Sequence, residues 1–432
     1  MTKLLAIPKP DALPILPGTG IDGQPVTLGV MGGGQLGRMF VHAAQAMGYA
    51  TAVLDPDATS PAGLVSHLHV HTDYLDAAGL TTLAQRCAAI TTEFENVPAQ
   101  ALQTLADTVP VAPAAQAVRI AQDRAQEKAH FGRCGVPCAP YALIESAEQL
   151  EAVDAYLLPG VLKTARLGYD GKGQIRVKNR AELAAAWGQL KKVPCVLEKM
   201  LALKSECSVI VARGWDGECV NLPVQLNLHR EGILAVTEVS RGNLPSALSK
   251  HAIAAAKSIA HELRYVGVLC VEFFILKDGS ADRKALGGLI VNEIAPRPHN
   301  SGHYSMNACD ISQFELQVRT LAGLPLTQPR QHSPAIMINL LGDLWFSKPV
   351  ATLDAVTTVP SLLPPAPVTP PWEKVLALPG THLHLYGKAK PAHGRKMGHL
   401  NITGNTVAEV RATALRAAKL LGIKPFYKKV RR

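Results

Sequence analysis

The sequence predicts an α/β protein with several domains, and three observations support this. At 432 residues the chain is long enough for two to four domains with hydrophobic cores of their own. Residues 26–47 follow the order strand, glycine-rich turn and amphipathic helix, which is typical of the start of a doubly wound parallel sheet. Residues 266–276 and 289–294 are rich in β-branched and aromatic residues, which predicts two neighbouring strands nearer the middle of the chain.

The first predicted unit is built around a glycine turn, Gly32-Gly33-Gly34-Gln35-Leu36-Gly37. Residues 26–31 form the strand before it, and residues 49–54 form a second strand that ends at Asp55. Backbone amides at the start of a helix suit an anionic group. Asp55 follows the glycines by about twenty residues, where a nicotinamide-dinucleotide enzyme holds its ribose. A dehydrogenase is therefore one interpretation, although Pro56 turns the chain into a loop and no hydride-transfer site follows.

A smaller α+β unit is predicted next. A helix over residues 124–134 leads to a strand over 160–163 that ends in Lys163, a glycine-rich loop over 168–174, and a strand over 195–198 that ends in Glu198. Three glycines among charged residues let a backbone close over phosphates. A flexible β-hairpin tip has the same composition. The lysine before the loop and the glutamate after it favour nucleotide binding.

Two carboxylates mark the central strands, Glu272 in the first and Glu293 in the second. A carboxylate within an apolar strand is costly unless it is paired, hydrogen-bonded or bound to a cation. Two of them on adjacent strands are typical of a site for a hard divalent cation that carries phosphate oxygens. Two solvent-facing glutamates on edge strands are the alternative. The apolar flanks and the following Arg-Pro-His-Asn-Ser-Gly-His of residues 297–303 favour the cation site.

The C-terminal part alternates His and Leu over residues 382–386, a pattern that indicates packing in a half-buried strand more often than metal binding. Lys388 and Arg395 follow on a glycine-punctuated hairpin. A lysine and an arginine in such a position are suited to holding a phosphate group.

The net charge of +10 raises the question of nucleic acid binding. The basic residues are spread along the chain, and their one dense cluster is the tail 424–432. No ladder of aromatic and basic residues of the kind used by single-strand binders is present. We therefore expect no nucleic acid partner, and an enzyme whose substrates carry phosphate explains the charge equally well.

The cysteines and the apolar pattern indicate the compartment. The eight cysteines are scattered and are expected to be reduced thiols of a cytoplasmic protein. No window is apolar for long enough to span a membrane. Residues 1–25 lack the apolar core of a secretory signal and are expected to form a loosely ordered extension.

An ordered set of short motifs resembles one known family. These motifs are Gly34-Gln35-Leu36-Gly37-Arg38-Met39, Gln122-Asp123-Arg124, Gly168-Tyr169-Asp170-Gly171-Lys172-Gly173-Gln174, Tyr265-Val266-Gly267-Val268, the run from Asn292-Glu293 to His303, and Gly394-Arg395-Lys396-Met397-Gly398-His399. Over about residues 26–420 the chain is thereby identified as a member of the N5-carboxyaminoimidazole ribonucleotide synthetases of purine biosynthesis, within the ATP-grasp superfamily.

The resemblance implies an ATP-grasp fold of α/β class, with an α+β lid. The implied parts are a loosely ordered extension over 1–25, a Rossmann-like N-terminal domain over 26–121, a linker helix and lid over 122–204, an ATP-grasp core over 205–330, and a small C-terminal substrate-binding segment with a basic tail over 331–432.

It also implies a reaction. ATP, bicarbonate and 5-aminoimidazole ribonucleotide would give N5-carboxyaminoimidazole ribonucleotide, ADP and phosphate through carboxyphosphate. The implied cofactors are ATP and Mg²⁺, with two ions accompanying the nucleotide. The implied assembly is a homodimer, and the mutase of the next step is expected on a separate protein.

Residue roles carried over from the family fall into four groups. Catalytic roles fall on Tyr169, Asp170 and Arg297. ATP binding is implied for Arg124, Lys163, Gly168, Tyr169, Asp170, Gly171, Lys172, Gly173, Gln174, Glu198, Lys199, Met200, Leu201, Glu206, His229, Asn292 and Glu293. Substrate binding is implied for Gln35, Leu36, Asn300, Ser301, Lys388 and Arg395, and metal binding for Glu272 and Glu293.

The chain departs from the family pattern in two places. Leu167 stands where a second loop glycine is expected, and residues 277–288 form a longer connection between strands than usual. The nearest rival within the superfamily is the formate-dependent glycinamide ribonucleotide transformylase. A nucleotide-binding module without catalysis is a rival of another class. It predicts loss of Glu272, Glu293, Lys163 or Arg297, and all four are present.

Overall fold

The protein is represented by a computed structural model that describes residues 10, 11, 13–20, 23–166, 168, 173–346 and 367–426. Several predicted features lie outside the described residues. They are residues 1–9, 12, 21 and 22 of the N-terminal extension, the loop residues Leu167 and Tyr169 to Lys172, and the tail 427–432. The described residues form three sheets.

The N-terminal unit contains a four-stranded parallel sheet in the order β3-β2-β1-β4. Its buried strands are apolar because helices cover both faces of such a sheet. The prediction of a parallel sheet is confirmed. The elements are β1 (Thr27–Met31), α1 (Gln35–Ala46), β2 (Ala50–Leu54), η1 (Gly63–Val65), β3 (Leu68–Val70), α2 (Ala77–Arg86), β4 (Ala89–Thr92), α3 (Ala99–Ala106) and α4 (Ala115–Ala121).

The lid follows helix α5 and has its own four-stranded antiparallel sheet in the order β5-β8-β6-β7. Helix α7 packs on it through Leu183 and Trp187, which join a small separate core. The elements are α5 (Arg124–Arg133), β5 (Tyr141–Ile144), α6 (Ala147–Glu151), η2 (Ala155–Leu157), β6 (Gly160–Thr164), β7 (Gln174–Val177), α7 (Arg180–Gln189) and β8 (Cys195–Lys199).

The remaining strands form one nine-stranded sheet in the order β14-β13-β9-β11-β12-β15-β17-β16, with β10 paired to β9. All its pairings are antiparallel. Its strands are β9 (Leu203–Arg213), β10 (Cys219–Asn221), β11 (Gln225–Arg230), β12 (Ile233–Val239), β13 (Gly267–Leu276), β14 (Leu289–Ala295), β15 (Ala335–Leu341), β16 (Thr381–Leu385) and β17 (Lys396–Thr403). The last three strands extend the core sheet, so the C-terminal segment shares a backbone ladder with the core.

Helices cover the two faces of this large sheet. Helix α8 packs on one face against Val271 and Phe273 of β13, and helix α11 packs on the other against Cys270. Successive side chains of a strand point to opposite faces, so β13 is buried on both. The helices and turns are α8 (Ser246–Glu262), α9 (Ala281–Leu286), η3 (Asn300–Gly302), α10 (Ser305–Ala308), α11 (Gln313–Ala322), η4 (Gly342–Trp345), α12 (Trp372–Leu376) and α13 (Val407–Leu420).

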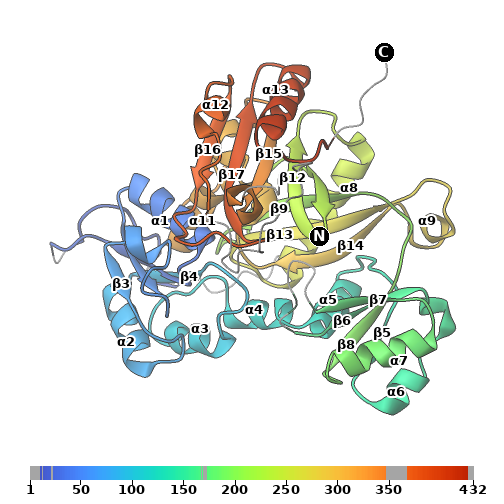
Figure 1. The fold of residues 1–432 in the computed structure, drawn as a ribbon. Helices are drawn as coiled ribbons and strands as arrows, with labels where there is room; N and C mark the ends of the chain where they lie inside the picture. Colours follow the sequence, from blue (N-terminus) through green and yellow to red (C-terminus); the bar gives the residue numbers. More distant parts are fainter. Residues whose placement is uncertain are drawn as a thin grey trace, which may run out of the picture.

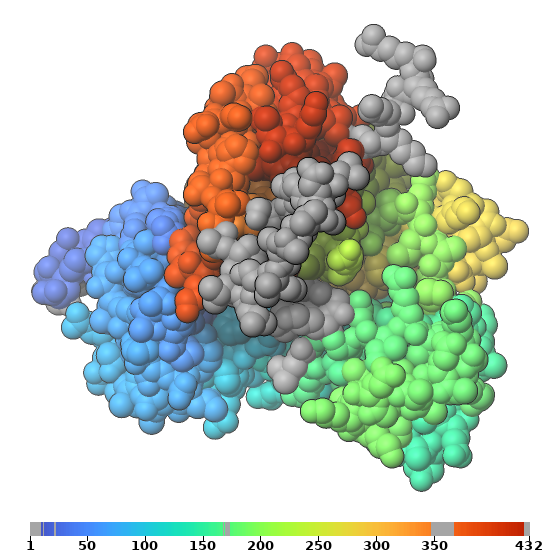
Figure 2. Space-filling view, viewed as in Figure 1, coloured from blue at the N-terminus to red at the C-terminus, as the bar shows by residue number. Residues whose placement is uncertain are grey.

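The parts surround a common centre. Figure 1 shows the N-terminal unit in blue on one side, the lid in green on the other and the C-terminal strands in orange and red above them. The N-terminal unit packs on the core because α1 shares a hydrophobic cluster with Val318 and Leu321 of α11. The space-filling view shows the same three lobes as distinct bodies (Figure 2).

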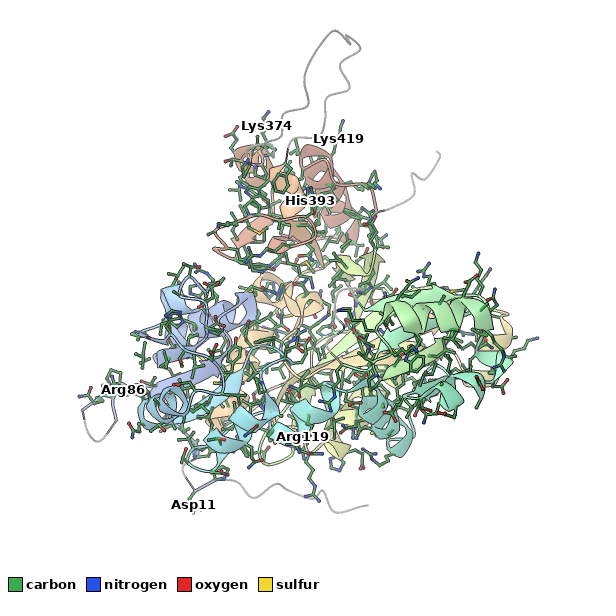
Figure 3. All side chains as sticks on the ribbon, turned by 60° about the horizontal axis from the view of Figure 1, so that its bottom comes forward. Asp11, Arg86, Arg119, Lys374, His393 and Lys419 are labelled. Atoms are coloured by element: carbon green, nitrogen blue, oxygen red, sulfur yellow. The ribbon has the colours of Figure 1, made fainter. Side chains whose placement is uncertain are left out.

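Exposed basic side chains are distributed over separate lobes. In Figure 3, Arg86 and Arg119 lie on the N-terminal unit, whereas Lys374 and Lys419 lie at the far end of the C-terminal segment. None of the eight cysteines, all of them described, forms a disulfide. Within the part of the chain that the structure describes, no helix combines the length and apolar character needed to cross a membrane.

Candidate active site

A cleft of about 1210 Å³ lies where the N-terminal unit, the lid, the core and the C-terminal segment meet. It gathers most of the site residues predicted from the sequence. Those that line it are Gln35, Leu36, Arg124, Lys163, Gly168, Gln174, Glu198, Lys199, Met200, Leu201, Glu206, His229, Glu272, Asn292, Glu293, Arg297, Asn300, Lys388 and Arg395. Gly173 and Ser301 are described but are not among the lining residues. Tyr169, Asp170, Gly171 and Lys172 lie outside the described residues.

The two predicted metal carboxylates lie directly opposite each other. Strands β13 and β14 pair antiparallel with Glu272 in register with Glu293. The register then shifts, because Phe273 pairs with Val291 and leaves Asn292 as an extra residue. A β-bulge of this kind re-aims side chains, and here both Asn292 and Glu293 line the cleft. Three oxygen-bearing side chains of neighbouring strands therefore line the same cleft.

The electrostatics of these side chains suit a divalent cation. Burial raises the pKa of Glu272 to about 7, and the neighbouring charge of Glu293 adds to the increase. The Oδ1 atom of Asn292 is buried with no hydrogen-bond partner among the described residues. Oxygen ligands of this type are the ones that Mg²⁺ prefers. The residues present therefore fit the ion that the family implies.

Two further side chains hold the carboxylates in place. The Nη1 atom of Arg124 donates to Glu293 at 3.1 Å, and the Nε2 atom of His299 lies 3.1 Å from Glu272. Burial lowers the pKa of His299 well below its usual value, so the ring is neutral. Glu127, one helical turn after Arg124, accepts from the backbone N–H of Ile294 at 2.7 Å and so fixes β14 next to Glu293.

A buried charge cluster marks the lid side of the cleft. Glu198 forms ion pairs with Lys128 and Lys163, each at 2.9 Å, and accepts a hydrogen bond from Lys163. Burial opposes ionisation of Glu198, but the two ammonium groups lower its pKa to about 2. The phosphate-binding role of Lys163 stays a prediction, and the structure places its ammonium group against Glu198 at the cleft wall. Lys128 was missed by the sequence analysis, because a lysine within a mostly polar helix carries no signal of burial.

The Glu206 carboxylate, predicted to bind ribose, forms an ion pair with His229. Strands β9 and β11 are neighbours and bring the two side chains together across the sheet. Burial tends to lower the pKa of His229, but the contact of its Nδ1 atom with the Glu206 carboxylate and the other carboxylates nearby raise it. His229 therefore carries positive charge at the cleft wall more readily than a free histidine.

The glycine turn is held by two carboxylates of its own unit. Asp55 accepts from the N–H of Gly33 at 2.6 Å, and Glu93 accepts from Gly34 at 2.7 Å and Gly37 at 2.8 Å. The amides that a dinucleotide would need are therefore already bonded, and Asp55 is occupied by the turn. This geometry argues against the dehydrogenase interpretation and leaves Gln35 and Leu36 at the cleft.

Arg297 lies between the N-terminal unit and the core. Its guanidinium forms a two-point ion pair with Glu95 from the loop after β4. Burial opposes the charge of Arg297, but Glu95 raises its pKa. The sequence analysis gave Glu95 no role, because its partner Arg297 is distant in the sequence.

The C-terminal hairpin brings basic groups to the opposite end of the cleft. Lys388 donates to the carbonyl of Lys396 at 2.8 Å, and Arg395 donates to the carbonyl of Lys390 at 2.7 Å. Gly394 donates to Asp343 at 2.8 Å, which ties the hairpin to η4. Lys396 also lines the cleft and was not predicted.

Asn300 and Ser301 differ in what they contact. Both polar atoms of the Asn300 side chain are buried without a hydrogen-bond partner among the described residues, and the residue lines the cleft. The Ser301 hydroxyl instead accepts from Ser208 at 2.8 Å and lies 2.9 Å from the Nδ1 atom of His299. Asn300 is therefore available to a ligand, whereas Ser301 supports His299.

Comparisons with known proteins agree with this geometry. Three family models match in order. They are the ribonucleotide synthetase preATP-grasp domain over 26–122, the ATP-grasp domain over 129–314 and the phosphoribosylaminoimidazole carboxylase C-terminal domain over 335–413. The N5-carboxyaminoimidazole ribonucleotide synthase of Brucella melitensis is 41% identical over 381 residues, which cover 87% of this chain and 95% of the relative. The chain belongs to the N5-carboxyaminoimidazole ribonucleotide synthase family.

Other members of the N5-carboxyaminoimidazole ribonucleotide synthase family are similarly close. The Bacillus subtilis synthase is 38% identical, covering 86% of this chain and 90% of its own. A Staphylococcus aureus synthetase structure in complex with ADP has a TM-score of 0.78 at 33% identity, covering 93% of this chain and 97% of its own. An Aspergillus clavatus synthase in complex with ADP and 5-aminoimidazole ribonucleotide has a TM-score of 0.78 at 29% identity, covering 92% and 98%. The predictions of the family and of the ATP-grasp fold are confirmed.

Proposed function

We propose that this protein carboxylates 5-aminoimidazole ribonucleotide with ATP and bicarbonate, and releases N5-carboxyaminoimidazole ribonucleotide, ADP and phosphate. The observation that carries the proposal is one cleft lined by Glu272 and Glu293, by Lys163 of the lid and by Lys388 and Arg395 of the C-terminal hairpin. A cleft in which separate parts of the chain supply phosphate-binding charge beside a candidate cation site suits two phosphorylated substrates.

The lid side is assigned to ATP. Lys163 and Arg124 would contact its phosphates, Glu206 its ribose, and the hinge residues 198–201 its adenine. Glu272, Glu293 and Asn292 would hold Mg²⁺, with two ions expected alongside the nucleotide. Bound Mg²⁺ neutralises phosphate charge and orients the γ-phosphate for transfer.

The remaining residues are assigned to the reaction itself. Phosphoryl transfer to bicarbonate requires positioning and charge neutralisation more than a nucleophilic side chain. Arg297, oriented by Glu95, would stabilise the anionic carboxyphosphate, and Asn300 would complete the polar wall beside it. Tyr169 and Asp170 of the glycine-rich loop are proposed to reach the aminoimidazole amine. Carboxyphosphate is labile in water, which suits a closing lid.

The other substrate is assigned to the C-terminal end. Lys388 and Arg395 would hold the 5′-phosphate of the ribonucleotide, helped by the Gln35-Leu36 turn. A lysine and an arginine on the same hairpin combine a point charge with a bidentate donor. This placement leaves the amine facing the carboxyphosphate between the two ends.

The decisive experiment is ADP release from ATP and bicarbonate, with and without 5-aminoimidazole ribonucleotide, in the presence of Mg²⁺. Strong stimulation by the aminoimidazole nucleotide is expected. Glycinamide ribonucleotide with formate serves as the rival pair, and stimulation by that pair alone would refute the proposal. Mass spectrometry of the product distinguishes carboxylation from uncoupled ATP hydrolysis.

We further propose that the protein is a homodimer in the cytoplasm. The eight free thiols suit a reducing compartment, and the homodimer is the assembly that the family resemblance implies. Light scattering on the purified protein tests the assembly state, and a monomeric mass at micromolar concentration would refute it.

A further inference from the structure

The connection between β13 and β14, residues 277–288, folds into helix α9 and returns toward the hinge between lid and core. Leu286 packs with Leu201 and Phe274 beside a small cluster of buried apolar residues. Ser280 caps the helix by accepting from the N–H of Arg283 at 3.2 Å. The connection is therefore an ordered element, and Figure 1 shows α9 at the outer end of the β13–β14 pair.

The hinge, residues 198–201, spans the end of lid strand β8 and the connection that leads through Ala202 to core strand β9. One carboxylate contacts this segment at two points. The Oδ1 atom of Asp282 accepts from the ammonium of Lys199 at 3.0 Å. Its Oδ2 atom accepts from the N–H of Ala202 at 3.2 Å. The contact is reinforced where the N–H of Lys277 donates to the carbonyl of Ala202 at 2.8 Å.

The same lysine connects the hinge to the lid. The Nζ atom of Lys199 lies 3.8 Å from the centre of the Tyr156 ring, which belongs to η2 of the lid. The side chains of Lys199 and Asp282 are only 17% and 14% exposed, so solvent screens their ion pair less than a surface pair. Burial opposes ionisation of Asp282, but the hydrogen bonds from Lys199 and Ala202 lower its pKa. Core, hinge and lid are thus linked through one charged contact.

We propose that Asp282 is a positioning residue for the nucleotide, which it serves by fixing the hinge that contacts the adenine base. The inference rests on the proposed function, because it takes residues 198–201 as the adenine contact. Met200 and Leu201 line the cleft directly between the two points that Asp282 holds. A binding segment that is ordered before the ligand arrives loses less conformational entropy on binding. Asp282 therefore raises ATP affinity without touching ATP.

The test compares variants of one connection in the full-length protein. Asp282→Ala removes both contacts, and Asp282→Asn keeps a neutral acceptor for Ala202 but removes the charge facing Lys199. The matched control is Asp278→Ala, because Asp278 is 63% exposed and pairs with Lys204 at 2.7 Å. Calorimetry measures the Kd of Mg-ADP, and steady-state kinetics measures KM for ATP and for 5-aminoimidazole ribonucleotide.

Asp282→Ala is expected to raise the ADP Kd and the ATP KM about tenfold, as the loss of one charge-assisted hydrogen bond implies. The kcat and the KM for the ribonucleotide should stay within about twofold. Asp282→Asn should lie between Asp282→Ala and the parent protein, and Asp278→Ala should match the parent. A thermal melt of each variant verifies folding. If Asp282→Ala does not fold, the comparison of Asp282→Asn with the parent protein provides the test.

The outcomes separate this inference from the proposed function. If the parent protein turns over ATP with the aminoimidazole nucleotide but both Asp282 variants keep its nucleotide affinity, the inference is wrong and the function stands. If all KM values rise together, Asp282 has a general structural role and the inference is also wrong. If the parent protein neither binds Mg-ADP nor turns over ATP, the proposed function itself fails.

Discussion

Replacing Glu198 with glutamine should destabilise the lid strongly. The substitution keeps the size of the side chain but removes the negative charge between Lys128 and Lys163. Lys128 has a side chain only 1% exposed and loses its counter-charge, whereas Lys163 is 12% exposed and retains some access to solvent. The cost should therefore arise chiefly at Lys128.

Two independent estimates of the stability lost in Glu198→Gln agree. Lowering the pKa of Glu198 from 4.5 to about 2 corresponds to roughly 3 kcal/mol of stability at neutral pH. Breaking a buried ion pair by removing one partner costs about 3–5 kcal/mol. We therefore expect Glu198→Gln to lose about 3 kcal/mol, a large share of the total stability of a typical domain.

The pH dependence has a definite sign. The folded pKa of Glu198 lies below the unfolded value, so its contribution is fully present above about pH 4.5 and is lost as the pH falls toward 2. The stability difference between the parent protein and Glu198→Gln should shrink to about half by pH 3. A difference that does not shrink on acidification would show that the ionised state of Glu198 is not its source.

The assay is urea unfolding followed by circular dichroism and by tryptophan fluorescence. Trp187 belongs to the lid core and reports on that part of the chain. Glu151→Gln is the matched control, because Glu151 is an exposed glutamate of the same lid. A loss of less than about 1 kcal/mol for Glu198→Gln would refute the reasoning, since it would mean that Lys128 is solvated or neutral in the folded state.

Three further predictions concern the reaction. Lys388→Ala and Arg395→Ala should each raise the KM for the ribonucleotide about 10- to 100-fold, while the KM for ATP stays nearly constant. Unchanged KM values would show that these residues do not hold the 5′-phosphate. Asp170→Asn should reduce turnover about 100-fold or more while ATP affinity measured by calorimetry stays near that of the parent, and unchanged turnover would remove its role at the amine. Removing Mg²⁺ with a chelator should abolish ADP release. Glu272→Gln should raise the Mg²⁺ concentration needed for the half-maximal rate about tenfold or more. An unchanged Mg²⁺ requirement in this variant would mean that Glu272 does not bind the ion.

Much of the fold and site was predictable because the signals were local. The strand–glycine–helix pattern predicted the parallel sheet, and the apolar runs around Glu272 and Glu293 predicted a buried carboxylate pair on neighbouring strands. The two strands pair with these glutamates in register, as predicted, but only Glu272 is buried, because the side chain of Glu293 is 41% exposed.

Other features depend on contacts between distant segments. The bulge at Asn292 is set by pairing with β13 and has no signature in the sequence. The role of Glu95 depends on its ion pair with Arg297, which lies far from it in the sequence. Asp55 matched the position of a ribose ligand, yet it bonds the glycine turn beside it. Spacing alone does not distinguish a carboxylate that binds a ligand from one that bonds its own backbone.

The continuous sheet from β14 to β16 has a mechanical consequence for the catalytic cycle. Each strand between Glu272 or Glu293 and the Lys388 hairpin is hydrogen-bonded to the next, so strand spacing determines the separation of these two groups. The lid has a sheet of its own, so a rotation of the lid about its connecting segments would leave that ladder intact. We expect the half of the cleft assigned to the ribonucleotide to keep its dimensions during turnover. Opening of the half assigned to ATP should determine when ADP leaves and the next ATP binds.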